Sequence, residues 1–182
     1  MQSNNYMPEQ PLVSIIINCF NGEKYLREAL NSVTMQTYKN WEIIFWDNQS
    51  TDKSAEIFKS YQDSRLKYYL APAHTKILYE ARNYALQKTK GDFIAILDVD
   101  DYWLPDKLEK QVKVMEQKSE IGFCYSGFKF LSEESKMKRS FIDISLLIQF
   151  SGKSPIWCSI TSLKSLFISL FSSNTRPPYS LS

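Results

Sequence analysis

Short apolar runs alternate with segments of helical spacing through the first 125 residues of this chain. The run Val13–Ile17 is rich in β-branched residues, and so apolar a strand is typical of a parallel sheet that is buried on both faces. Further runs predict strands at 41–46, 66–70, 93–97 and 121–125. Because strands alternate with helices, the pattern favours right-handed βαβ crossovers and an α/β, Rossmann-like domain with a mostly parallel sheet and flanking helices.

Between these runs, apolar residues recur at the three- and four-residue spacing of amphipathic helices. The first helical segment, 26–33, has Asn21 available as its N-cap. A second helix is predicted to open at Ser50–Asp52, and a third contains Ala81. Pro105 suits the first turn of a fourth helix, because its missing N–H costs nothing there.

The composition is that of an ordinary globular domain. The 182 residues are 43% hydrophobic and 23% charged, and the net charge of +2 gives no reason to expect nucleic-acid binding. No apolar stretch reaches the roughly 20 residues of a membrane span, and the first ten residues lack the features of a signal peptide. The three cysteines are far apart in sequence, so we expect a reduced, cytoplasmic protein.

Acidic residues stop at Asp143. The segment 144–182 contains no Asp or Glu, and its charged side chains are Lys153, Lys164 and Arg176. From this shift in composition we predict three parts: an N-terminal extension (1–10), a folded domain (11–150) and an atypical serine-rich tail (151–182).

Polar residues gather just beyond three of the predicted strands. Ligands of open α/β sheets bind outside the carboxyl ends of the strands, which makes these residues candidates for a binding site. They are Asn18, Cys19, Phe20 and Asn21 after the first strand, Asp47, Asn48 and Ser50 after the second, and Asp98, Val99, Asp100 and Asp101 after the fourth. Asn and Asp are also common in loops and caps, and that interpretation stays open for each position.

The acidic cluster at 98–101 is the most informative of these groups. Three carboxylates within four residues repel one another unless a cation or a donor compensates them. Magnesium takes oxygen ligands, usually one or two carboxylates together with substrate phosphates. The alternative is a solvated acidic loop that caps the helix of Pro105. An EF-hand is excluded, because Trp103 stands where its calcium loop needs a glycine.

Several other functions lack their motifs. The chain contains no Gly-x-Gly-x-x-Gly fingerprint, which argues against a dinucleotide-binding protein, and it has no P-loop. His74 is the only histidine, so a multi-histidine zinc site is excluded, and no Gly-x-Ser-x-Gly elbow supports a serine hydrolase.

The order of the motifs resembles the family 2 glycosyltransferases, which use nucleotide sugars and have the GT-A fold. The resemblance covers about residues 11–130 and rests on the segments Val13–Asn21, Leu30–Tyr38, Trp41–Asp52, Glu80–Asn83 and Gly91–Asp101. It implies a complete half for the nucleotide-sugar donor and an incomplete acceptor half.

The resemblance also implies roles for individual residues. Asn18, Phe20 and Asn21 would lie in the loop that approaches the nucleotide base, and Asp47 or Asn48 would hydrogen-bond that base. Arg82 would lie near the phosphates, with a helix-surface arginine as the equal alternative. Asp98 and Asp100 would form the Asp-x-Asp motif that binds Mg²⁺ or Mn²⁺, with Asp98 contacting the ribose or the metal.

The implied activity is transfer of a sugar from a nucleotide-diphosphate donor to a saccharide or lipid-linked acceptor, with inversion, in surface polysaccharide or lipopolysaccharide synthesis. Such an enzyme would be cytoplasmic, with weak peripheral membrane contact at the inner face as an open option. The family's general base is an Asp or Glu from the later part of the fold, and no base is identified in the carboxylate-free tail. The alternative is a truncated, inactive module that binds nucleotide sugars.

Overall fold

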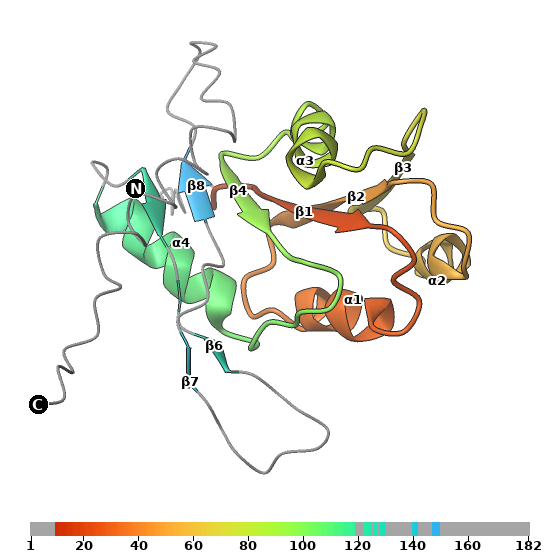
Figure 1. Ribbon diagram of the computed structural model, residues 1–182. Coiled ribbons are helices and arrows are strands. Elements are labelled where there is room, and N and C mark those ends of the chain that lie inside the picture. Colours follow the sequence, from red (N-terminus) through yellow and green to blue (C-terminus); the bar gives the residue numbers. More distant parts are fainter. Residues whose placement is uncertain are drawn as a thin grey trace, which may run out of the picture.

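The computed structural model describes residues 10–118, 122–124, 126, 128–129, 140–141 and 147–149. The centre of the fold is a six-stranded sheet (Figure 1). Its strands, in spatial order, are β3 (Leu66–Leu70), β2 (Trp41–Asp47), β1 (Val13–Cys19), β4 (Phe93–Ile96), β8 (Leu147–Gln149) and β5 (Phe123–Cys124). The predicted tail at 151–182 lies outside the described residues, as does nearly all of the predicted extension at 1–10.

The four strands from β1 to β4 are parallel, which confirms the predicted α/β architecture. Val13 is in register with Trp41 of β2 on one side and with Phe93 of β4 on the other. The first apolar run therefore forms β1, in the middle of the parallel part of the sheet. Every residue of β1 and β2 is buried. This burial explains why their sequences read as continuous apolar runs rather than as alternating ones.

The sheet departs from the prediction at its far edge. β8 lies between β4 and β5 and runs antiparallel to both. The predicted fifth strand, β5, therefore does not pair directly with the parallel strands. The predicted strand 121–125 is described only as Phe123–Cys124. A separate pair, β6 (Phe128–Lys129) and β7 (Ser140–Phe141), is antiparallel.

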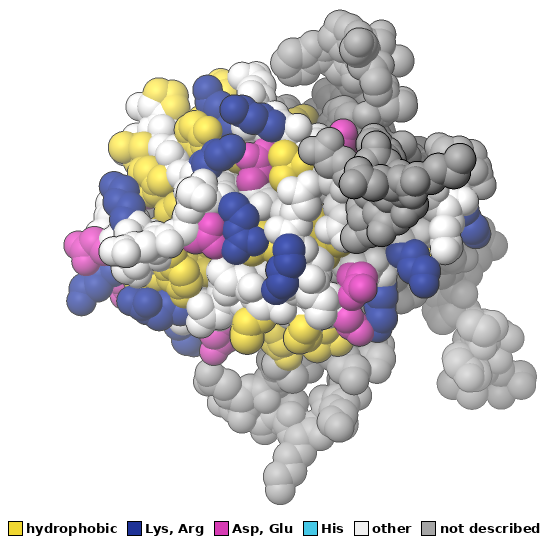
Figure 2. Space-filling model, turned by 180° about the vertical axis from the view of Figure 1, so that it is seen from behind, with side chains coloured by type: hydrophobic (Ala, Val, Ile, Leu, Met, Phe, Trp, Pro, Cys, Tyr) yellow, Lys and Arg dark blue, Asp and Glu magenta, His cyan; other side chains and the backbone are white. Residues whose placement is uncertain are grey.

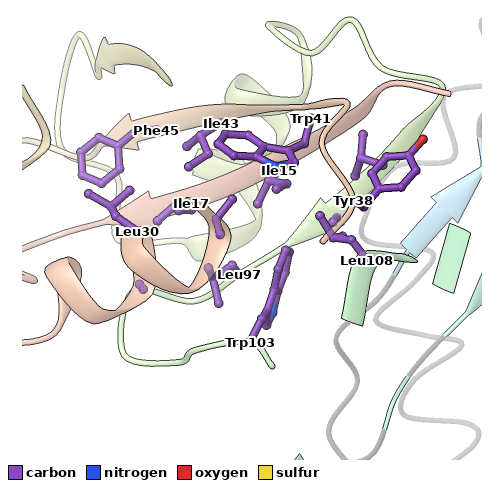
Figure 3. Packing of buried hydrophobic residues seen from close by; sticks show 14 of the residues in the cluster. Ile15, Ile17, Leu30, Tyr38, Trp41, Ile43, Phe45, Leu97, Trp103 and Leu108 are labelled. Atoms are coloured by element: carbon purple, nitrogen blue, oxygen red, sulfur yellow. The ribbon is translucent and has the colours of Figure 1, made fainter. Parts of the chain in front are cut away.

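Helices cover both faces of the sheet, as Figure 1 shows. Helices α1 (Leu26–Thr34), α2 (Ser54–Lys59) and α4 (Lys107–Gln117) lie on one face, and α3 (Leu78–Leu86) lies on the other. Odd-numbered residues of β1 and β2 contribute to the larger core, where Trp41 and Phe45 are fully buried (Figure 3). Burying one such aromatic side chain stabilises the fold by about 2–3 kcal/mol.

Three expected helix starts are wrong in detail. Asn21 does not cap α1, since it has φ 54° and its side chain bonds Thr51 in another loop. Helix α2 begins at Ser54 rather than at Ser50–Asp52, and Asp52, just before it, accepts the N–H of Ser54. Pro105 lies in the turn before α4, which begins at Lys107.

Candidate functional site

The carboxyl ends of β1, β2 and β4 meet at one edge of the sheet. The chain runs outward from β1 through β2 to β3 and then crosses through α3 to β4 on the other side of β1. This reversal makes the crevice between β1 and β4 a topological switch point, where open α/β sheets bind ligands. Asn18 and Phe20, Asp47 and Asn48, and Asp98 and Asp100 therefore come to the same edge, as the sequence predicts.

The loops after β1 and β2 are joined by reciprocal hydrogen bonds between side chains and backbone. Asn21 Oδ1 accepts the Thr51 N–H at 2.8 Å, and the Asn21 N–H donates to Ser50 Oγ at 3.1 Å. Glu23 forms a second pair of bonds between the loops, since its N–H donates to Asp52 Oδ2 and its Oε2 accepts the Lys53 N–H, both at 2.9 Å. These bonds hold the two loops of the candidate site together.

Asp47 is a buried anchor at the end of β2. Its Oδ1 accepts the Ser50 N–H at 2.7 Å and its Oδ2 accepts the Tyr68 hydroxyl at 2.6 Å. Burial, together with this bond to Asp47, raises the pKa of Tyr68 well above its usual value, so Tyr68 stays a donor. Asp47 thus fixes the loop after β2 to strand β3. Its role toward a nucleotide base stays a prediction.

Asn48 fixes the loop that follows β3. Its side chain bonds both backbone groups of Thr75, with Oδ1 accepting the N–H at 3.0 Å and Nδ2 donating to the carbonyl at 2.7 Å. The His74 ring lies 4.4 Å from the half-exposed Phe20 ring, measured between centroids. His74 and Thr75 are neighbours of the site that the sequence interpretation missed, although they follow a predicted strand end like the other candidates.

Arg82 lies in α3 and forms an ion pair with Asp98 beyond the end of β4. Its side chain is 19% exposed, and its role toward phosphates stays a prediction. Asp98 is half exposed and Asp100 is exposed, so both carboxylates remain accessible. The hydrogen bond from Asp101 N–H to the Asp98 carbonyl, at 3.0 Å, closes a turn around Val99 and Asp100.

Helix α4 begins several residues after the acidic loop. Its N-cap position is Asp106, and the N–H of Leu108 is satisfied by Gln36 Oε1 at 3.0 Å. The carboxylates of the cluster at 98–101 are exposed, so a solvated acidic loop stays an alternative. Val99 packs against Gly22, where an added Cβ would come within 2.6 Å of Val99 Cγ2. Gly22 thus allows the loops after β1 and β4 to touch.

Two buried polar groups near Asp98 keep unused hydrogen-bonding capacity. Neither Asn18 Oδ1 nor Asn18 Nδ2 has a partner among the described residues, and the same holds for Arg82 Nε. Asn18 follows the registered pair Ile16–Ile96 by two residues, as Asp98 does on the neighbouring strand. Buried polar atoms are normally satisfied, so these groups mark a place where a polar partner would be stabilised.

The sequence model of glycosyl transferase family 2 matches residues 14–173. The chain belongs to this family. Among its relatives, the Escherichia coli protein named UDP-Glc:alpha-D-GlcNAc-diphosphoundecaprenol beta-1,3-glucosyltransferase WfgD is 39% identical over 124 residues, covering 68% of this chain and 48% of the relative. The putative teichuronic acid biosynthesis glycosyltransferase TuaG of Bacillus subtilis is 33% identical, covering 73% and 53% respectively. The chain thus spans about half the length of these relatives.

Solved structures show the same glycosyltransferase fold. S. aureus TarS in complex with UDP matches with a TM-score of 0.63 and 25% identity over 68% of this chain and 37% of TarS. A mannosyltransferase of Pyrobaculum calidifontis, solved with GDP-Man and Mn²⁺, matches with a TM-score of 0.60 and 23% identity over 65% of this chain and 36% of that one. The parallel sheet with flanking helices is thus the GT-A fold that the motifs imply.

Two features of this family member concern contact with a membrane. No helix in the described part of the chain is long and apolar enough to cross a membrane. Around the loop from β3 to α3, the hydrophobic side chains of Leu70, Ile77 and Leu78 are exposed. Figure 2 shows hydrophobic side chains beside Lys and Arg side chains on the face seen from behind.

Proposed function

We propose that this chain contains the donor-binding part of a glycosyltransferase that moves a sugar from a nucleotide-diphosphate donor to a saccharide or lipid-linked acceptor with inversion. The observation that carries this proposal is the meeting of three strand ends at one edge, with Asp98 and Asp100 exposed there, in a member of glycosyl transferase family 2. TarS, which shares the fold, was solved with UDP and with UDP-GlcNAc.

In this proposal the nucleotide base lies toward the loops after β1 and β2. The half-exposed ring of Phe20 offers a stacking surface, and Asn48 and Asp47 hold the loops beside it through their buried hydrogen bonds. Arg82 lies at the other end of the site, next to Asp98. A guanidinium suits a diphosphate, because its planar fork of N–H donors matches phosphate oxygens.

Asp98 and Asp100 fit a divalent cation that is shared with a substrate. Among the described residues there is no group of three or more His, Cys, Asp and Glu side chains that could enclose a metal ion. Magnesium is, however, usually held by one or two carboxylates plus substrate phosphates, and two exposed carboxylates meet that need. When bound, Mg²⁺ or Mn²⁺ would neutralise the charge that grows on the leaving diphosphate.

Inversion requires a base that takes the proton of the acceptor hydroxyl as it attacks the anomeric carbon. The acidic side chains that follow β6 in sequence are Glu133, Glu134 and Asp143, which lie outside the described residues. WfgD is named for a diphosphoundecaprenol-linked acceptor, and TuaG for teichuronic acid biosynthesis. We accordingly place the enzyme in the cytoplasm, in surface polysaccharide synthesis, with weak peripheral contact at the inner membrane face through the exposed loop from β3 to α3.

Calorimetry tests donor binding directly. The 182-residue chain is titrated with UDP, UDP-glucose, UDP-GlcNAc and GDP-mannose, with Mn²⁺ and with EDTA. We expect cation-dependent binding of one nucleotide class, and we expect Asp100→Asn to abolish that dependence. Asp106→Asn, a change of an acid outside the site, serves as the matched control and should bind normally. If no nucleotide binds with Mn²⁺, or if Asp100→Asn binds normally, the proposal is wrong.

A transfer assay then separates an enzyme from a binding module. Sugar release from a radiolabelled donor to lipid-linked and free saccharide acceptors measures transfer, and the anomeric configuration of the product reports inversion. Nucleotide binding without transfer by this chain would favour the alternative, a module that binds nucleotide sugars but is catalytically inactive.

A further inference from the structure

Gln36 is a fully buried amide just beyond Met35, the C-cap residue of α1. Its side chain makes three hydrogen bonds. Nε2 donates to the carbonyl of Ser32 at 2.9 Å and to that of Leu104 at 2.7 Å, and Oε1 accepts the N–H of Leu108 at 3.0 Å. Both amide protons are therefore used. The bond to Ser32 reaches back to α1, while the other two reach a segment about 70 residues further along the chain.

Those two distant bonds hold the chain where it leaves the acidic loop. Leu104 follows the loop that carries Asp98 and Asp100, and Leu108 lies in the first turn of α4. The other end of the loop is held by β1, because Leu97 N–H donates to the Ile16 carbonyl at 3.0 Å. The loop that carries the exposed carboxylates is thus held at one end by β1 and at the other end by Gln36.

Other contacts also hold this loop, among them the ion pair of Asp98 with Arg82. Val99 packs against Gly22, and the Trp103 side chain points into the core beside Leu97 (Figure 3). Thr37 adds a backbone bond to the Pro105 carbonyl at 2.8 Å and an exposed hydroxyl bond to Glu109 at 2.7 Å. The Gln36 side chain is itself fully buried, and its bonds to Ser32 and Leu108 are buried while its bond to Leu104 is partly buried. Bonds away from water are electrostatically stronger than exposed ones.

We propose that Gln36 is a positioning residue for the cation-binding carboxylates. The inference rests on the function proposed above and goes beyond it, since Gln36 touches neither cation nor nucleotide. Asp98 is held by its ion pair with Arg82, whereas Asp100 is exposed, so where the two ends of the loop are fixed also affects how the two carboxylates lie. Displacing such a pair by about 1 Å is enough to cost about 100-fold in function. Gln36 fixes one of those ends through the carbonyl of Leu104.

The test uses the full chain and two variants of different severity. Gln36→Met keeps the approximate length but removes all three bonds, and Gln36→Glu keeps the acceptor for Leu108 while removing the donor to Leu104. The control is Ser14→Ala, which removes a buried hydroxyl bonded to Glu42 and Gly91. Ser14 lies near the amino end of β1, whereas the candidate site lies at the carboxyl ends of the strands. Each variant is measured for thermal midpoint, for UDP or GDP affinity in EDTA, and for the Mn²⁺ concentration at half-saturation of nucleotide binding.

We expect both Gln36 variants to raise the Mn²⁺ concentration at half-saturation about tenfold or more while changing affinity in EDTA less than twofold, since only the loop moves. Ser14→Ala should lower the midpoint without changing the Mn²⁺ requirement. If the folded Gln36 variants lose thermal stability like Ser14→Ala but keep the wild-type Mn²⁺ requirement, Gln36 is only structural and the inference fails. A wild-type chain without any Mn²⁺-dependent nucleotide binding would instead remove the proposed function itself.

Discussion

The guanidinium of Arg82 contacts the carboxylate of Asp98, and this ion pair joins helix α3 to the end of β4 across the candidate site. Arg82 is mostly buried, whereas Asp98 is half exposed. The guanidinium of Arg82 is therefore shielded from solvent, while the carboxylate of Asp98 stays accessible. It also relieves the repulsion among the carboxylates at 98–101, which the sequence leaves uncompensated.

Replacing Arg82 should weaken binding of the nucleotide diphosphate. For Arg82→Gln we expect affinity for UDP or GDP with Mn²⁺ to fall about tenfold, equivalent to about 1.4 kcal/mol, because a charged hydrogen bond to phosphate is lost. Arg82→Lys should recover only part of this loss, since a lysine lacks the planar fork of donors. Calorimetry measures both variants.

The control for Arg82 is Lys110→Gln, which breaks the exposed i,i+4 pair of α4 with Asp106. Exposed pairs of this kind contribute about 0–1 kcal/mol to stability, so we expect little change in fold or binding. Equal nucleotide affinity in Arg82→Gln and in the wild type would show that Arg82 serves only to hold Asp98 and α3 together.

Adding a methyl group at Gly22 should disturb the acidic loop. In Gly22→Ala the new Cβ would lie 2.6 Å from Val99 Cγ2 and 2.9 Å from Cys19 Sγ. Overpacking of this kind costs about 1–3 kcal/mol of unfolding free energy, and here it pushes on the turn that carries Asp98 and Asp100. We expect a lower thermal midpoint and weaker Mn²⁺-dependent nucleotide binding.

A second substitution distinguishes this contact from a general loss of packing. Val99→Ala removes the methyl groups that the new Cβ would strike, so the double variant Gly22→Ala/Val99→Ala should regain most of the cation-dependent binding. Failure of the double variant to recover beyond Gly22→Ala would mean that Cys19, rather than the acidic loop, absorbs the clash.

Much of this arrangement can be predicted from the sequence, because it depends on local patterns. The apolar run at Val13–Ile17 predicts a strand buried on both faces. The end of that strand determines where Asn18 and Phe20 lie. The position of Asp98 and Asp100 follows in the same way from the run that forms β4. Strand type and strand end are thus encoded within a few residues.

The features that escape prediction depend on partners far away in the chain. Asn21 matches the profile of an N-cap, but Thr51 competes for its side chain from another loop and holds the residue at φ 54°. The position of β8 between β4 and β5 cannot be predicted either, because no local spacing in the sequence specifies which strand it pairs with. Gln36 looks like any polar residue at a helix end, because its two decisive partners lie about 70 residues away.

The buried network around Glu42 predicts a pH-dependent stability. Glu42 lies in β2, accepts the Ser14 hydroxyl at 2.6 Å and the Lys90 N–H at 2.9 Å, and forms an ion pair with Lys67. Burial alone would raise the pKa of Glu42, but the bonds from Lys67, Ser14 and Lys90 lower it below the ordinary value of 4.5. The unfolded chain therefore binds this proton more readily than the folded protein does.

The sign of the effect follows from that lowered pKa. The stabilisation is fully present above pH 4.5 and is lost as the pH falls through the lower pKa of the folded protein. Glu42→Gln should lower the free energy of unfolding by about 3 kcal/mol at pH 7. The difference from the wild type should shrink below pH 4.5, as urea titrations at several pH values would show. The exposed change Glu28→Gln is the control, and a constant difference down to pH 3 would contradict the assignment.

Phe20 should contribute to nucleotide binding independently of the cation. Its ring is half exposed and lies against His74, at the end of the site that is formed by the loops after β1 and β3. Stacking of a base on an aromatic side chain contributes about 1–3 kcal/mol, so Phe20→Ala should weaken UDP or GDP binding about tenfold. Because the base carries the contact, we expect the same factor with Mn²⁺ and with EDTA.

Two further variants make the result specific to the ring at position 20. Phe20→Tyr keeps an aromatic face and should bind like the wild type. Met35→Ala removes a side chain that is 62% exposed after the last turn of α1, which is outside the site, and should have no effect on binding. If Phe20→Ala weakens binding only when Mn²⁺ is present, the ring acts through the acidic loop, and the base does not lie at this end of the sheet.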